Sequence, residues 1–353
     1  MNNPRIISIG TAVPERSFTQ QELSDLFNPS NPKIIKLFAQ SHIKKRHLQL
    51  PVTEDHTIAE ESPDDLLAKH RQGILSYGGE ALSKALQEAG IAPEQLDYLI
   101  CVTSTGYLCP GASALLTKQF GLRDNIHRLD VVGMGCNAAI NAMQPLVQYL
   151  RFSPRSVGAM VCIENCSAAY IVNEEMGTAV VNSLFGDAAA AVVICGSEFE
   201  PIPATAGGYP AVADFESHII TDSMEAMRFD RVDNKLSFYL DRSIPYVLGN
   251  NVHFPVERLL KKNQLKKRQI SWWVIHSGGK KVIDSIKVNL DLSDYDVRHT
   301  LSVLENYGNI SSCSVLFSLH QLAYEGTVHP QDNGIIMAMG PGASIETALL
   351  RWV

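Results

Sequence analysis

The feature that most limits the fold of this chain is an internal similarity between segments that lie 173 residues apart. With this shift, CVTSTG (101–106) falls on VIHSGG (274–279), and GMGCNAA (133–139) falls on NYGNISS (306–312). The first segment of each half is a short apolar run of the kind that forms a buried strand. A chance match of weak patterns is one explanation, but one shift that fits both pairs favours an internal repeat.

A repeat of this size predicts an α/β protein built from two similar halves. We expect an N-terminal half over residues 1–200 and a C-terminal half over residues 201–353, although a chain of 353 residues could also form two separate domain cores. Two halves packed about a pseudo-twofold axis would bring equivalent strand ends and helix starts to the centre. Cys136, His276 and Asn309 would then share one cavity.

Composition and charge argue against several classes of protein. The chain has 30 lysines and arginines against 37 aspartates and glutamates, a formal net charge of −7, which does not suggest a general nucleic-acid-binding surface. Its longest apolar run, Ala188 to Cys195, is far too short to span a bilayer, and the N-terminus lacks the pattern of a secretion signal. We therefore expect a globular, cytoplasmic protein without a membrane segment.

The seven cysteines form no CxxC pair, and most of them lie in apolar, strand-like segments. They are therefore predicted to be mainly reduced core thiols, and no zinc site is indicated. The sequence also lacks GxGxxG after a strand and GxxxxGK[ST], so neither a dinucleotide nor a P-loop nucleotide is expected.

Cys136 differs from the other cysteines because it lies where a strand-like run gives way to a helical pattern, in residues 130–150. One helix face is formed by Ile140, Met143, Val147 and Leu150. Cys136 then lies near the first helical turn, where unpaired N–H groups and the positive dipole end favour a thiolate nucleophile. The small neighbours leave room for a substrate, although glycines in such a turn also have a purely structural use.

His276 and Asn309 are the candidate partners of this thiol. His276 ends a strand-like run, a position where α/β proteins place ligand-binding groups, whereas Asn309 taken alone is equally suited to cap the helix that begins there. A neutral imidazole and an amide can both donate to one developing oxyanion, which the decarboxylation of a malonyl thioester to its enolate requires. The enolate would attack a Cys136 thioester, and the loss of carbon dioxide would drive carbon–carbon bond formation.

Four ordered blocks, GMGCNAA, VIHSGGKKVID, YGNISS and MGPGASIET, together with VVNSLFGDAAAAVVI, resemble the type III polyketide synthases, the chalcone-synthase-like branch of the thiolase fold. The resemblance spans nearly the whole chain. It implies a homodimer of five-layered αβαβα subunits and a catalytic triad of Cys136, His276 and Asn309. It also implies CoA thioesters as substrates, with no metal and no further cofactor.

The same resemblance implies roles for residues outside the triad. Phe185 and Phe238 match two phenylalanines that gate the passage between the CoA tunnel and the cavity, although each taken alone reads as a core residue. Lys33 and Lys36, one helical turn apart, match basic positions that hold CoA phosphates, although a solvated charge pair is equally expected. Gln40 stands where the family often has another basic residue.

Cavity positions of the family fall on Ser104, Thr105, Cys166, Ala169 and Ser311. The family's cyclisation loop falls on Gly340, Pro341 and Gly342, which taken alone indicate only a turn. The sequence departs from the plant enzymes at Gly133 and Met134, where those enzymes commonly carry two glutamines. This departure argues against plant-type aromatic starters.

Within the family, CVTSTGYLCPG, TAVVNSLFGDAAA and YVLGNNV are most similar to the bacterial 3,5-dihydroxyphenylacetyl-CoA synthases. That resemblance implies the condensation of four malonyl-CoA units, closure of the ring by an aldol reaction, and helper enzymes of the enoyl-CoA-hydratase type. The alternatives are a synthase that makes a pyrone or tetrahydroxynaphthalene and a ketoacyl-carrier-protein synthase III. A degradative thiolase would want a second cysteine near the C-terminal glycine turn, and a catalytically silent subunit would be expected to have a damaged triad.

Overall fold

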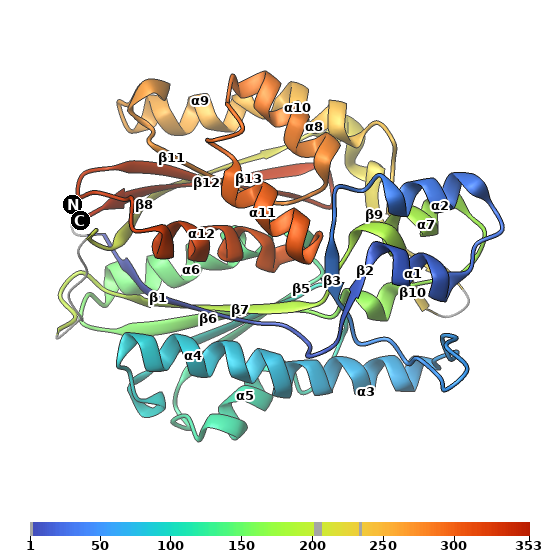
Figure 1. Ribbon diagram of the computed structural model, residues 1–353. Helices are drawn as coiled ribbons and strands as arrows, with labels where there is room; N and C mark the ends of the chain where they lie inside the picture. Colours follow the sequence, from blue (N-terminus) through green and yellow to red (C-terminus); the bar gives the residue numbers. More distant parts are fainter. Residues whose placement is uncertain (1–2, 201–206, 233–234) are drawn as a thin grey trace.

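Two related sets of strands form the frame of the molecule, which the computed structural model describes over residues 3–200, 207–232 and 235–353 (Figure 1). The N-terminal set comprises, in sheet order, β1 (Arg5–Ala12), β7 (Ala188–Cys195), β6 (Val157–Glu164), β4 (Tyr98–Thr103) and β5 (His127–Val132). The C-terminal set comprises β8 (Pro210–Ile219), β13 (Ser344–Trp352), β12 (Asn333–Gly340) and β11 (Trp272–Ile275). The two sets meet where Arg5 pairs with Ala211.

The strand directions repeat from one set to the other. In the N-terminal set, β7 is antiparallel to both β1 and β6, and β4 is parallel to β6. In the C-terminal set, β13 is antiparallel to both β8 and β12, and β11 is parallel to β12. The repeat is incomplete, however, because the shift of 173 places β5 on residues 300–305, which belong to helix α11 (Arg298–Tyr307). The two predicted halves are therefore similar in topology but differ at the outermost strand.

Helices fill the layers between and outside the two sheets (Figure 1). Between the sheets lie α6 (Ala138–Phe152) and α12 (Ser314–Glu325), with α11 packed beside α12. The outer layer on the N-terminal sheet comprises α3 (Pro63–Gly73), α4 (Gly79–Ala89) and α5 (Ala112–Phe120). The outer layer on the C-terminal sheet comprises α8 (Ile244–Asn251), α9 (His253–Lys262) and α10 (Lys280–Leu290). This is the predicted five-layered αβαβα arrangement.

The apolar patterns of the sequence explain why these elements occupy the core. All eight residues of β7 are buried, because helices cover both faces of its sheet. The predicted apolar face of α6 is fully covered, at Ile140, Met143, Val147 and Leu150. This face and α12 pack against residues of both sheets, so the central layer joins the two halves into one core.

A smaller group of elements covers the end of the frame that lies on the right of Figure 1. It comprises β2 (Ser17–Thr19), α1 (Gln20–Phe27), α2 (Pro32–Ala39), β3 (Lys45–His47), α7 (Met176–Leu184), β9 (Met227–Val232) and β10 (Lys235–Leu240). Asn31 caps α2 by accepting from the backbone of Lys33, and Pro32 occupies the first turn. Helix α2 packs against α7, which leads directly into Phe185.

Short helical turns connect the larger elements, at Ile74–Gly78, Pro93–Gln95, Gly135–Asn137, Cys166–Ala169, Thr221–Ala226, Lys267–Gln269 and Ser311–Cys313. The predicted boundary between residues 200 and 201 adjoins residues 201–206, which lie outside the described residues, and it stays a prediction. Across the described ranges, no helix combines the length and apolar character needed to cross a membrane.

Candidate active site

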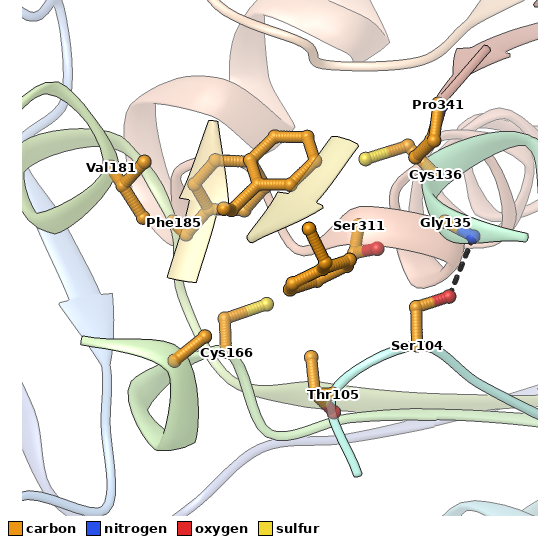
Figure 2. A pocket seen from close by; sticks show the side chains of 12 residues that line it. Ser104, Thr105, Gly135, Cys136, Cys166, Val181, Phe185, Ser311 and Pro341 are labelled. Carbon is orange, nitrogen blue, oxygen red and sulfur yellow. Dashed lines mark hydrogen bonds between the residues drawn. The ribbon is translucent and has the colours of Figure 1, made fainter. Parts of the chain in front are cut away.

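The carboxyl ends of strands from both sheets meet at a small apolar cavity, as expected for a ligand site in an α/β protein (Figure 2). The space that its residues surround, counted together with adjoining open solvent, is about 370 Å³. The lining residues are Ser104, Thr105, Gly135, Cys136, Cys166, Ala169, Val181, Phe185, Phe229, Phe238, Ser311 and Pro341. All five cavity positions inferred from the sequence thus lie on its wall, together with the expected nucleophile, both gate phenylalanines and the central residue of the cyclisation loop.

Cys136 lies in the short turn that precedes α6, and its sulfur points into the cavity (Figure 2). The turn is made possible by Gly133 and Gly135, whose φ angles of 81° and 77° suit glycine. The Cys136 side chain is largely buried, and its Sγ lies 4.0 Å from Asn309 Oδ1. Residues 173 positions apart are thus in direct contact, as the repeat predicts.

Asn309 is held by backbone pairing with the segment that carries the gate residue Phe185. Its N–H donates to Leu184 O at 2.9 Å, and its carbonyl accepts from Gly186 N at 2.9 Å. Its side-chain Oδ1 accepts from Ser311 N at 2.9 Å, which leaves the Nδ2 donor for an incoming ligand. The asparagine is therefore held directly beside Phe185, the residue expected to gate the cavity.

His276 follows β11 and lies next to this asparagine loop, although neither residue lines the empty space itself. Its backbone N–H donates to Met337 O of β12 at 2.9 Å, and the Oγ of the following Ser277 donates to Gly308 O at 3.2 Å. The ring is 2% exposed, and among the described residues its Nδ1 has no hydrogen-bond partner. A buried polar atom without a partner is uncommon in native proteins and calls for an explanation.

Burial decides the charge of the thiol and the imidazole when each is considered alone. Removal of water raises the pKa of Cys136 to about 12 and lowers the pKa of His276 to about 3. Hydrogen bonds between Cys136 and the side chains of Ser311 and Asn309 lower the Cys136 pKa, but by less than burial raises it. The thiolate expected from the helix start is therefore wrong for the isolated thiol. Proton transfer from thiol to ring would create both charges together, and their attraction would offset burial.

Three phenylalanines form an apolar part of the cavity wall that Cys136 also lines. Phe185 and Phe238 meet edge to face, with ring centroids 5.4 Å apart and an interplanar angle of 82°. Phe229, which the sequence analysis missed, packs on Phe238 at 5.1 Å and is its direct partner in the β9–β10 ribbon. The alternation of apolar and polar residues along β9 and β10 was the sequence signal that could have indicated Phe229. Such a wall keeps water from a reactive intermediate.

Glu164 is a second residue that the sequence analysis missed. It ends β6, is fully buried, and lies just behind the cavity wall. One carboxylate oxygen accepts from Ser104 N at 3.0 Å, and the other accepts from Ser312 Oγ at 2.5 Å and from Ser311 Oγ at 3.2 Å. Burial raises its pKa to about 7, so it can give or take a proton near neutral pH. An acidic residue within an apolar run was its only sequence signal.

The buried carboxyl of Glu164 should make stability depend on pH. Its pKa rises from 4.5 to about 7 on folding, so the folded state binds the proton more tightly and stability falls as pH rises through this window. The loss should approach about 3 kcal/mol by pH 8. Urea unfolding at pH 5 and pH 8 should show this loss in the native protein and not in Glu164→Gln. An identical pH dependence in both proteins would contradict the assignment.

The remaining candidates lie outside the cavity. Lys33 and Lys36 are exposed on α2, and neither forms an ion pair within the described ranges. Gln40 ends the same helix and is also exposed. All seven cysteines lie in the described part of the chain and are free thiols. The described residues contain no group of three or more His, Cys, Asp or Glu side chains that could hold a metal ion.

Comparisons with known proteins agree with this geometry. A family model described as chalcone and stilbene synthases, C-terminal domain, matches residues 215–353, and one described as FAE1/type III polyketide synthase-like protein matches residues 34–202. The chain is 45% identical to the 3,5-dihydroxyphenylacetyl-CoA synthase of Streptomyces toyocaensis, over 99% of this chain and 90% of that protein. It is 44% identical to the enzyme of the same name from Amycolatopsis balhimycina, over 99% and 93%.

The fold is likewise similar to solved structures. The C-terminal type III polyketide synthase domain of Steely1, from Dictyostelium, superposes with a TM-score of 0.90 at 26% sequence identity and covers 99% of both chains. Because the match extends over nearly the whole chain, it includes both sheets, the central helices and the smaller group of elements that contains α2 and α7.

Proposed function

This chain belongs to the type III polyketide synthases, and from that membership we propose that it condenses four malonyl-CoA molecules into 3,5-dihydroxyphenylacetyl-CoA. The observation that carries the proposal is the contact of Cys136 Sγ with Asn309 Oδ1 beside an apolar cavity. The product is inferred from the similarity of the whole chain to enzymes named for this reaction.

The first step loads a malonyl-derived starter on Cys136. The thiol proton passes to His276 as Sγ attacks the thioester carbonyl, and CoA leaves as its thiol. Because burial disfavours each charge alone, the proton moves as the new bond forms. The phenylalanine wall at Phe185 and Phe238 holds water away from the acyl-enzyme.

Each extension then uses the hydrogen-bond donors beside the thiol. The His276 ring and Asn309 Nδ2 hold the thioester oxygen of a malonyl-CoA while its carboxylate leaves as carbon dioxide. The resulting enolate attacks the Cys136 thioester and takes over the growing chain. Three extensions give a tetraketide. An intramolecular aldol closure with loss of water gives a dihydroxylated ring that keeps its CoA thioester.

The surroundings of the cavity support two further parts of the proposal. Lys33 and Lys36 lie on the exposed face of the helix that packs against the gate helix α7, which suits them to hold CoA phosphates at the entrance. Strand β5 is an edge of its sheet, and exposed apolar side chains lie at or near it at Val132, Met134 and Tyr107. A second subunit on this edge would cover them, which supports a homodimer. Cytoplasmic localisation and helper enzymes stay predictions.

The proposal is tested by incubating the purified protein with malonyl-CoA alone and identifying the product by mass spectrometry. An eight-carbon aromatic CoA thioester, formed with release of carbon dioxide and free CoA, is the expected result. A free pyrone or tetrahydroxynaphthalene would assign a different type III product. Inertness with malonyl-CoA but turnover with malonyl-carrier protein would assign a ketoacyl-carrier-protein synthase instead.

A further inference from the structure

The residue after the nucleophile, Asn137, makes a contact that its place at a helix start does not require. Asparagine at this position usually caps the helix, but the Asn137 side chain makes no cap hydrogen bond to α6. Instead its Nδ2 donates to Ser344 Oγ, at the first residue of β13, at 2.6 Å. Asn137 is 1% exposed and Ser344 is 7% exposed, so this bond joins the two halves inside the protein.

Ser344 extends the contact to the cyclisation loop. Its Oγ accepts from Asn137 and donates to Pro341 O at 3.1 Å. The loop also packs closely on the nucleophile turn, since a Cβ at Gly340 would lie 2.4 Å from Asn137 Oδ1 and a Cβ at Gly135 would lie 2.2 Å from Pro341 Cδ. Both neighbours of Cys136 are therefore in contact with this loop, and Figure 2 shows Pro341 beside Cys136.

A third contact holds the turn from the N-terminal half. Gly135 N donates to Ser104 Oγ at 2.6 Å, which Figure 2 shows as a dashed line. The Cys136 side chain itself has a long 4.0 Å contact with Asn309 and a hydrogen bond with Ser311. Both neighbours of Cys136 are held by bonds and close contacts of their own, which help to position its sulfur relative to the asparagine amide.

From these contacts we infer that Asn137 is a positioning residue that, with Ser344, locks the nucleophile turn onto the cyclisation loop. The inference rests on the proposed role of Cys136 as the nucleophile. Because Pro341 also lines the cavity, the same contacts fix the position of the Cys136 sulfur, which carries the acyl chain, relative to the part of the cavity wall against which that chain folds. A shift of about 1 Å at such a group lowers a reaction rate by about a hundredfold.

The test is a double-mutant cycle with Asn137→Leu, which keeps the branched shape, and Ser344→Ala. Each single variant should lower kcat for malonyl-CoA consumption about 10- to 100-fold and change KM less than about threefold, because the lost contact orients the nucleophile rather than binding substrate. The double variant should lose no more than the more affected single variant, since one bond is removed in every case. Circular dichroism at the assay temperature checks that each variant is folded.

A second measurement does not depend on the substrate. The rate of Cys136 alkylation by iodoacetamide should change at least about threefold in both single variants and by the same factor in the double variant. Ser318→Ala is the matched control, because Ser318 is a fully buried serine of α12 whose Oγ has no partner among the residues described. It should leave both rates unchanged. Unaltered alkylation in Asn137→Leu, or effects that add in the double variant, would overturn the inference whatever the product is.

Discussion

Replacing Cys136 with alanine should abolish carbon–carbon bond formation, with a loss of at least about a thousandfold in product from malonyl-CoA. The reason is that the growing chain has no other attachment point: of the two cysteines that line the cavity, only Cys136 has its sulfur against the Asn309 amide. Product formation is measured by mass spectrometry. The variant should still decarboxylate malonyl-CoA slowly, because His276 and Asn309 remain.

The matched control is Cys195→Ala, a buried thiol at the end of β7 and outside the cavity. It should form the same product at a rate close to that of the native protein. Undiminished extension by Cys136→Ala would falsify the assigned nucleophile. Loss of decarboxylation as well as extension in a folded variant would show instead that the thiol acts in both steps.

The second large effect is expected at His276. His276→Ala should lower malonyl-CoA decarboxylation about 100- to 1000-fold, because one of two donors to the developing oxyanion is lost. Burial lowers the pKa of the ring to about 3, so the ring stays neutral and keeps a single N–H donor between pH 5 and pH 8. Decarboxylation by Cys136→Ala, which removes the coupled thiol, should therefore be nearly independent of pH over this range.

A conservative replacement distinguishes hydrogen bonding from simple space filling. His276→Gln retains an N–H donor in a side chain of similar length and should keep more decarboxylation activity than His276→Ala. Suppose that the decarboxylation rate of Cys136→Ala falls toward the acid end of the range between pH 5 and pH 8, and that adding His276→Ala removes this fall. The ring would then be charged during the reaction. That result would contradict a neutral donor.

Sequence periodicity was sufficient to predict two similar α/β halves, because both halves obey the same local rules. The apolar runs that became β4 and β11 and the helical pattern after Cys136 needed only backbone propensity and burial to be recognised. The shift of 173 residues pairs Cys136 with Asn309 in the sequence, and these two residues are in contact in the structure. The same reasoning failed where the halves diverge, at α11, because a repeat carries no information about elements that only one copy has.

Several parts of the site had no local signal. Asn137 reads as an ordinary cap, and its bond to Ser344 spans 207 residues of sequence. Phe229 reads as one aromatic residue in a short strand, and only the β9–β10 pairing places it on Phe238. Each of these contacts depends on how elements from different layers pack, which one segment of sequence cannot specify.

By itself, then, the order of residues determined two similar α/β halves and the three catalytic candidates, because these follow from local patterns and a repeated motif. The family and the αβαβα layers followed from the resemblance of its motifs to the type III polyketide synthases. The tertiary structure alone decided how the groups behave. Burial raises the pKa of the Cys136 thiol, opposite to what the helix start predicts, and it raises the pKa of Glu164 to about 7. Solvation is a property of the assembled surroundings, and the charge of a buried group depends on neighbours that are distant in sequence.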